Sequence, residues 1–183
     1  MSATNKYPER GSSLIVVILV MAFMLSVGIA LLTITGVAPK VSGSVRSQEE
    51  AFNVAEAGFE SARIMIEGNL LSGSWTSLSD NCLQTPAGID VPLQSNYYRK
   101  LSDISLLQTL SAGNKGVIFY DQPFVKNADG TNDTSRTYTV FLINQGIASD
   151  AMMVCIGVVR AGTHVLASSR LEIDLGIQSG KNP

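Results

Sequence analysis

Few residues of this 183-residue chain could do chemistry, and none stands in a recognisable catalytic pattern. The single histidine, His164, forms no readable Ser-His-Asp or Cys-His set. Carboxylates between Asp129 and Asp133 are spaced nearly as in a calcium loop, but the required residue order and the distal glutamate are missing. We therefore expect a turn at Asp129–Asp133, no metal or other cofactor, and no enzyme activity.

The two cysteines, Cys82 and Cys155, are far apart in the sequence and show no metal-binding spacing. If their domain lies outside the inner membrane, a disulfide between them would be stable and would contribute about 2–4 kcal/mol by closing a long loop. The alternative is a pair of buried free thiols. The residues themselves leave both alternatives open.

The composition favours one globular domain plus a separate apolar helix. Of the residues, 45% are hydrophobic and 15% charged, and much of the apolar excess lies in one segment. Without that segment, the remaining length suits a single ordinary domain. The formal net charge of −2 provides no basic surface, so no contact with nucleic acid is expected.

The apolar segment runs from Gly11 to Leu32, and no charged residue occurs from Gly11 through Pro39. As a helix rising about 1.5 Å per residue, Leu14 to Leu32 is nearly long enough to cross a bilayer core of about 30 Å. A secretory signal peptide is shorter and ends in a small-residue cleavage site, which this run lacks. The segment therefore predicts a transmembrane helix.

After Pro39 the helical pattern becomes amphipathic. Apolar residues recur at three- and four-residue steps, which predicts one face that packs on a sheet. These residues are Val41, Val45, Phe52, Ala55, Phe59, Ala62, Ile66 and Leu70. Charged residues lie between them, and Gly68 and Gly73 indicate the end of the helix.

The C-terminal part favours strands. We expect them at 116–120, 136–144, 151–160 and 164–175, the last two joined as a hairpin through Gly162. Residues 72–115 predict a long connection with one short helix between Lys100 and Leu110. The predicted fold class is α+β, with one long N-terminal helix lying across a C-terminal antiparallel sheet.

Two short stretches carry a resemblance to a known family. Glu9-Arg10-Gly11 precedes Ser12 and the apolar run, and Phe52 to Glu60 contains Ala55-Glu56-Ala57-Gly58. Together they resemble the minor pilins of type IV pili, and among them the PilX-type pilus assembly proteins. The resemblance covers residues 9–67, and it implies a type IV pilin-like fold.

The resemblance also implies processing at the N-terminus. Prepilin peptidase would cut between Gly11 and Ser12, and Ser12 would become the N-methylated first residue. The implied organisation is a leader at 1–11, a transmembrane helix at 12–38, its amphipathic continuation at 39–70 and a globular head at 71–183. The chain would first span the bacterial inner membrane with a periplasmic head, and would then belong to a cell-surface pilus.

One position departs from the family pattern. Most pilins carry glutamate at the fifth mature position, which is Val16 in this chain. A carboxylate in lipid is costly unless it is paired, and in major pilins it is thought to meet the N-terminal amine of a neighbour. Val16 cannot make that pairing, which suits a position at or near the filament tip. The alternative is that Val16 is one more lipid-facing residue.

The resemblance implies a structural protein that promotes initiation and assembly of a pilus, and it leaves motility, adhesion and DNA uptake open as the use of that pilus. Implied partners are other minor pilins, the major pilin and a large tip adhesin of the PilY type. One rival is a tip-type pseudopilin of type II secretion, although 72–115 is too short for the α-domain usual there. Another rival is a single-pass anchored periplasmic domain, which predicts an uncut Gly11.

Overall fold

The structure is a computed structural model of the whole chain. It describes residues 10–144 and 151–176, except for the side chains at 10–12, 34 and 36–40. The chain falls into two compact units that divide after Gly43, and each is taken separately below.

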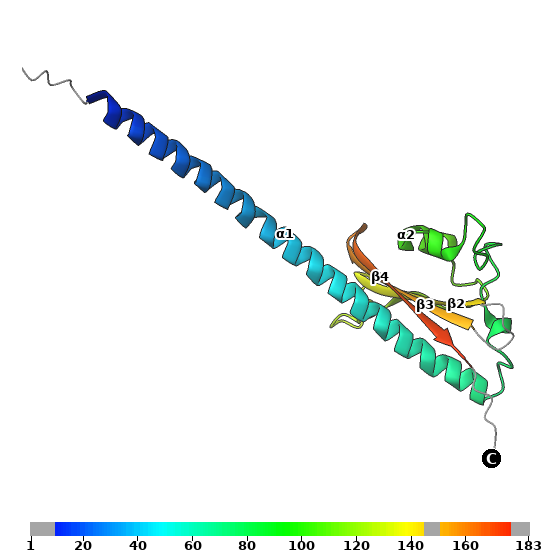
Figure 1. The fold of residues 1–183 in the computed structure, drawn as a ribbon. Coiled ribbons are helices and arrows are strands. Elements are labelled where there is room, and N and C mark those ends of the chain that lie inside the picture. Colours follow the sequence, from blue (N-terminus) through cyan, green and yellow to red (C-terminus); the bar gives the residue numbers. More distant parts are fainter. Residues whose placement is uncertain (1–9, 145–150, 177–183) are drawn as a thin grey trace, which may run out of the picture. The chain divides into compact units, whose positions relative to one another are not determined.

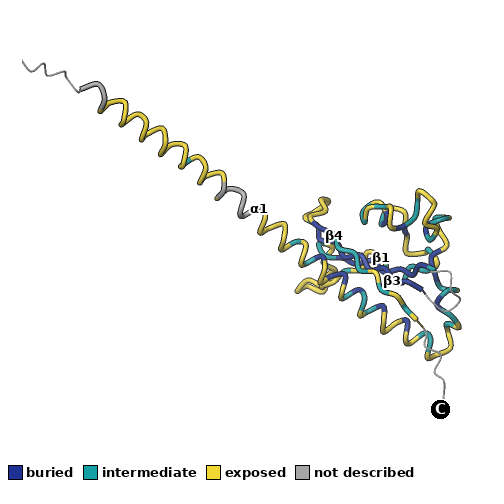
Figure 2. Tube along the Cα trace, in the orientation of Figure 1, coloured by how far each residue is buried: buried dark blue, intermediate teal, exposed yellow. Residues whose placement is uncertain are grey.

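Helix α1 (Arg10–Leu71) contributes to both units. In the first unit, Ser13–Thr33 is the one stretch of the described residues that is long and apolar enough to cross a membrane, and none of it is buried inside the structure (Figure 2). Because each of its large apolar side chains is exposed, this stretch needs an environment that the described chain does not supply.

The second unit contains a four-stranded antiparallel sheet in the order β1-β2-β3-β4. Figure 1 labels β2, β3 and β4 beside the second half of α1. The strands are β1 (Val117–Pro123), β2 (Arg136–Asn144), β3 (Ala151–Ala161) and β4 (His164–Leu175). All four lie where the sequence predicts strands, and β3 and β4 form the expected hairpin. The predicted α+β class, with a long helix on an antiparallel sheet, is confirmed.

The second half of α1 packs on one face of this sheet through small residues. An added Cβ at Gly157, in the middle of β3, would lie 2.2 Å from the Ala51 carbonyl oxygen and 2.5 Å from the Ala55 nitrogen. One turn further along α1, an added Cβ at Gly58 would lie 2.9 Å from the Tyr138 ring. The helix therefore approaches the sheet closely because these positions lack bulk.

The face of α1 that packs on the sheet differs from the predicted one at its start. The buried residues of α1 are Ala51, Val54, Ala55, Gly58, Ala62 and Ile66. Val41, Val45 and Phe52, which we expected on the same stripe, are 55%, 51% and 45% exposed. Phe52 directly follows Ala51, and successive residues of a helix are turned by about 100°, so the Phe52 side chain points away from β3 when Ala51 contacts it.

Polar contacts fix the position of α1 along the sheet. The Gln48 side chain donates to the Ser168 carbonyl at 2.9 Å, and Glu50 pairs with Arg136 at 3.3 Å. These contacts join the helix to β4 and β2, on either side of the close contact with β3. The helix is therefore held at three strands, which fixes its register on the sheet.

Residues 83–110 cover the opposite face of the sheet and are called the outer layer below. This layer includes η2 (Tyr98–Lys100) and α2 (Asp103–Thr109), and it follows η1 (Ser79–Asn81). Its buried side chains pack against Phe141, Val154 and Ile156; they are Leu83, Ile89, Tyr98, Leu106 and Leu110. The predicted short helix is confirmed as α2, but the interpretation of this stretch as a mere connection is wrong. The strands are apolar on both faces, so each face needs a cover.

Arg170 of β4 joins the outer layer to the sheet. Its guanidinium donates to the Asp103 carboxylate at 2.8 Å and to the carbonyl oxygens of Tyr98 and Leu101 at 3.1 and 3.0 Å. Ser168 donates to the other oxygen of Asp103 at 2.8 Å. One arginine thus satisfies a carboxylate and two loop carbonyls.

Replacing Arg170 by methionine is expected to destabilise the chain by about 3 kcal/mol. The Asp103 carboxylate would lose its charged partner, and the carbonyls of Tyr98 and Leu101 would lose their donor, in a largely buried site. Denaturant unfolding of the full chain in detergent measures the change. Arg63→Met is the matched control, since Arg63 pairs only with exposed glutamates of the same helix, and it should change stability little. Equal effects of the two substitutions would contradict this role of Arg170.

Candidate assembly interface

The exposed apolar part of α1 is the first candidate surface. Val16, at the position where the sequence departs from the family pattern, is 57% exposed, and its apolar neighbours are exposed to a similar extent. The side chains of Gly11 and Ser12, the predicted cleavage site, lie outside the described residues. Cleavage between them, methylation of Ser12 and the role of Val16 therefore stay predictions.

The motif Ala55-Glu56-Ala57-Gly58 lies where α1 meets the sheet. Ala55 and Gly58 are buried against β3 and β2, whereas Glu56 is exposed on the outer side of the helix. The motif thus combines the two small residues that allow close helix–sheet packing with a charged residue that faces away. Sequence inspection found the motif, but its packing role depends on Gly157, which lies about a hundred residues further along the chain.

Of the two alternatives for Cys82 and Cys155, the structure does not contain the disulfide. Both cysteines are free thiols, buried in the core cluster between α1 and the sheet. The Cys82 thiol, at the end of η1, donates to the Leu78 carbonyl at 3.3 Å, and Cys155 lies in the middle of β3. The alternative of two buried thiols fits, because each packs as a small apolar side chain.

Burial makes both thiols weak acids. It raises the pKa of Cys82 to about 11, with added repulsion from Asp90 and Asp80, and it alone raises the pKa of Cys155 to about 12. Both values lie above the ordinary value of 9.0. Since the thiolate is the reactive form, both groups should be inert in the folded chain near neutral pH.

We expect the native chain at pH 8 to react with a thiol reagent only at its rate of unfolding, and the chain in denaturant to titrate two thiols. Above pH 9.0 the unfolded chain loses its thiol protons first, so stability is complete below that pH and falls as pH rises towards 11 to 12. Absorbance titration and alkaline melting curves measure these effects. Finding no thiol in the unreduced, unfolded chain would contradict the structure.

The stretch Asp129–Asp133 forms a turn in the β1–β2 connection. The Asp129 carboxylate accepts from the Thr131 nitrogen at 2.9 Å and hydroxyl at 2.6 Å, and these bonds lower its pKa. Asp133 accepts from the Ser135 nitrogen at 2.8 Å and pairs with Arg136 at 3.4 Å, with a lowered pKa. Both carboxylates thus hold the turn, as the sequence predicts.

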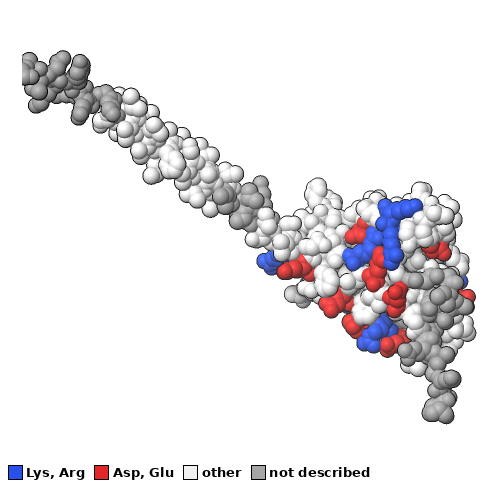
Figure 3. Space-filling model, in the orientation of Figure 1, with Lys and Arg blue, Asp and Glu red and all other residues white. Residues whose placement is uncertain are grey.

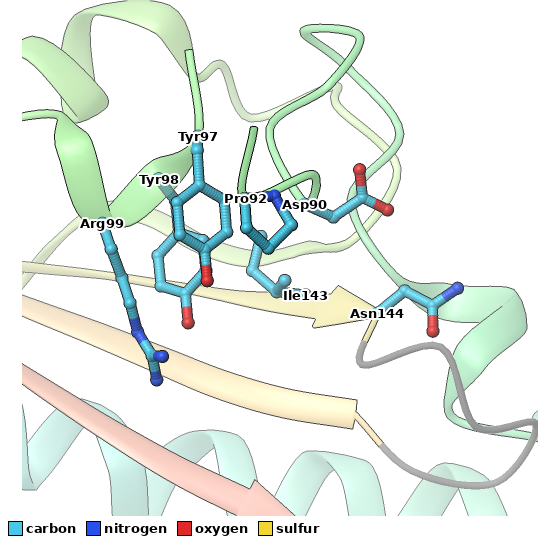
Figure 4. A pocket seen from close by; sticks show the side chains of 7 residues that line it. All are labelled: Asp90, Pro92, Tyr97, Tyr98, Arg99, Ile143 and Asn144. Carbon is cyan, nitrogen blue, oxygen red and sulfur yellow. The ribbon is translucent and has the colours of Figure 1, made fainter. Parts of the chain in front are cut away.

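A pocket of about 300 Å³ lies between the outer layer and the end of β2 (Figure 4). Its lining residues are Asp90, Pro92, Tyr97, Tyr98, Arg99, Ile143 and Asn144. The Tyr98 hydroxyl donates to the Met152 sulfur at 2.8 Å, and burial raises the pKa of this hydroxyl. Arg99 pairs with Glu172 at 2.7 Å. The polar groups of Tyr98 and Arg99 are therefore already bonded to side chains of the sheet. His164 does not line this pocket and lies at the exposed start of β4.

Comparison with known proteins gives one match. Residues 10–60 match a family model described as PilX N-terminal. This part of the chain is similar to the N-terminal region of PilX-type proteins. No match was found among curated proteins or among solved structures.

The matched region ends within the sheet-packing half of α1. It includes the exposed apolar stretch, Val16, and the small residues Ala51, Ala55 and Gly58 that contact the sheet. The PilX-type region therefore supports a type IV pilus minor pilin in general, and such a pilin assembles with other pilus components. The apolar helix fits membrane anchoring of the same protein.

Proposed function

We propose that this chain is a structural, non-enzymatic minor pilin that promotes initiation and assembly of a type IV pilus. Two facts about α1 together support the proposal. Residues 10–60 match the PilX N-terminal family model, and the apolar stretch Ser13–Thr33 within them is exposed. Such a helix is stable in lipid and can move into a bundle of similar helices, because both environments remove it from water.

The position that we propose is at or near the filament tip. Val16 removes the carboxylate that would pair with the N-terminal amine of a neighbouring subunit. A subunit without this pairing loses one contact along the filament axis, which costs least at an end of the filament. The second-best position is an ordinary place along the filament, with Val16 as one more apolar residue.

The proposed life cycle has two stages. The chain first spans the inner membrane with its head in the periplasm, where prepilin peptidase cuts between Gly11 and Ser12 and Ser12 is methylated. It then joins other minor pilins and the major pilin through its helix, with a large PilY-type tip adhesin as a further partner of the head. Residues 72–145 are the proposed partner-binding part of the head, since loops tolerate the variation that partner choice needs.

Mass analysis of the N-terminus tests this proposal. Chain purified from membranes and from sheared surface filaments is expected to begin at methylated Ser12, and the leader of residues 1–11 should be absent from both. In a strain lacking prepilin peptidase, the chain should keep its leader and be missing from filaments. A chain that starts at Met1 or Ser2 in cells with an active peptidase would support a single-pass anchored domain instead.

The remaining rival is a tip-type pseudopilin of type II secretion. The outer layer contains only η2 and the seven-residue helix α2, which leaves no room for the large α-domain usual in that rival. Deleting this chain should therefore reduce surface piliation and leave protein secretion unchanged. Loss of secretion with normal piliation would favour the pseudopilus.

A further inference from the structure

We infer that the outer edge of β4 and the adjoining flank of α1 accept an extended segment of a partner protein, which would pair with β4 as a fifth strand. The chemistry of the site requires a segment in which apolar and basic side chains alternate. This inference goes beyond the proposed function, and the test below uses the purified chain without a pilus.

The two edges of the sheet differ in their ability to accept a strand. Strand β1 has two register shifts, Asp121 at a φ of 47° and Pro123 without an N–H. The Asp121 carboxylate is also held by Arg160 at 3.0 Å and Thr137 at 2.6 Å. Bulges and proline are the means by which edge strands are protected from pairing. By contrast, β4 pairs regularly with β3 from Ala167 to Leu175.

The unpaired backbone groups of β4 can be identified because, along an antiparallel strand, the N–H and C=O groups of successive residues point alternately to its two sides. Arg160 donates its N–H towards β2, and Gln48 binds the Ser168 carbonyl from outside the sheet. The residues of β4 that face β3 are therefore the odd-numbered ones, and the even-numbered ones point outward. Within the described part of the chain, no strand lies beyond β4 to pair with Arg170 and Glu172.

Two hollows follow the seam between β4 and α1. One, of about 370 Å³, is lined by Gln48, Glu49, Phe52, Asn53 and Ser169. The other, of the same size, is lined by Phe59, Arg63, Ile66, Glu67, Leu70, Leu78 and residues 173–176. Both lie on the helix side of the sheet, at Ser169 and at Ile173–Leu175. A strand beside β4 would therefore place alternate side chains into apolar space at both ends of the seam.

The charge along the seam selects the partner's polar side chains. The exposed side of α1 from Gln48 to Leu71 carries Glu49, Glu56, Glu60 and Glu67 and one arginine, Arg63, and of these Glu49, Arg63 and Glu67 line the hollows. Arg63 is already shared between Glu60 at 3.0 Å and Glu67 at 2.9 Å. Figure 3 shows acidic side chains following this part of α1. An approaching strand is therefore favoured if its polar residues are lysine or arginine.

A second copy of this chain does not fit the same edge. Antiparallel pairing of β4 with itself would place a twofold axis perpendicular to the sheet and reverse the second copy's α1. Helices that start from one membrane run in one direction, so this pairing cannot form between neighbours in that membrane. The acidic flanks of two copies would also repel each other.

The test uses the full chain in a non-ionic detergent and two nine-residue peptides, one alternating valine and lysine and one alternating valine and glutamate. The valine–lysine peptide is expected to bind at least about tenfold more tightly, a difference of 1.4 kcal/mol. Bound peptide should slow hydrogen exchange of the Arg170 and Glu172 amides, measured by NMR. Those of Leu171 and Ile173, already paired with β3, should change little.

Glu172→Pro removes one outward N–H without touching the β3 ladder, and it should weaken binding about tenfold or more. Glu172→Ala, the matched control, loses the same contact with Arg99 and keeps the N–H, so its affinity should stay within about twofold.

Glu56→Lys provides a variant that leaves β4 unchanged. It should weaken binding of the valine–lysine peptide and strengthen that of the valine–glutamate peptide. The inference is overturned if neither peptide binds, if binding leaves the Arg170 and Glu172 amides unprotected, or if Glu56→Lys changes neither affinity.

Discussion

Replacing Gly157 by alanine is expected to destabilise the head by at least about 4 kcal/mol, a large part of the total stability of an ordinary domain. The added methyl group would lie 2.2 Å from the Ala51 carbonyl oxygen and 2.5 Å from the Ala55 nitrogen, both in the helix backbone. No side-chain rotation can relieve such a contact, so the helix must move away from β3 and lose its packing along the sheet. Thermal unfolding of the full chain in detergent, followed by circular dichroism, measures the loss.

Two other glycines of the chain serve as matched controls. At Gly58 the nearest atoms to the added methyl group belong to the Tyr138 side chain and not to backbone, so alanine should cost less, about 1–3 kcal/mol. At Gly68, exposed on the same helix, nothing lies within 4 Å, and alanine should stabilise by about 1 kcal/mol through helix propensity. The order Gly157, Gly58, Gly68 is the expected result, and equal effects at the three positions would contradict the close contact.

Replacing Val16 by glutamate should move the chain from the filament tip into the body of the filament. In the proposed pilin role, the new carboxylate meets the N-terminal amine of a neighbouring subunit. A hydrogen bond to a charged group contributes about 1.5–3 kcal/mol, which corresponds to about tenfold or more in occupancy. Quantitative mass spectrometry of sheared filaments measures the ratio of this chain to the major pilin.

Val20→Glu is the control for this experiment, since it places the same charge one helical turn further into the apolar stretch. Val20 is 52% exposed, close to the 57% of Val16, so the two sites differ mainly in their distance from the N-terminus. The glutamate at residue 20 has no amine to meet and should lower the amount of chain in filaments. If both variants lower it equally, residue 16 has no special part in subunit contacts.

The sequence was most informative where one periodicity continued over many residues. The strands at 136–144, 151–161 and 164–175 alternate or are apolar throughout, and a two-residue connection containing Gly162 limits β3 and β4 to a hairpin. The apolar stretch before Thr33 was equally clear, because a helix that is apolar on every side is found in a membrane or in the core of a large protein, and a domain of this size has no such core.

Features that depend on contacts between distant residues were not predictable in the same way. Phe52 fits the helical stripe by spacing, yet it is 45% exposed, whereas Ala51 is fully buried against Val159 and Ala167. Only the position of β3 under the helix decides between them. The outer layer was missed because Leu83, Ile89 and Tyr98 lie in irregular backbone without any period.

The two faces of the sheet belong to different layers, and this separation has a consequence for how such chains can diverge. Along β2, Val140 and Leu142 face α1, whereas Phe141 and Ile143 face the outer layer. A mutation in the outer layer therefore has to fit side chains that α1 never contacts. Descendants of one ancestral chain could acquire new outer layers, and with them new partners, while inheriting an unaltered helix that still fits the same bundle.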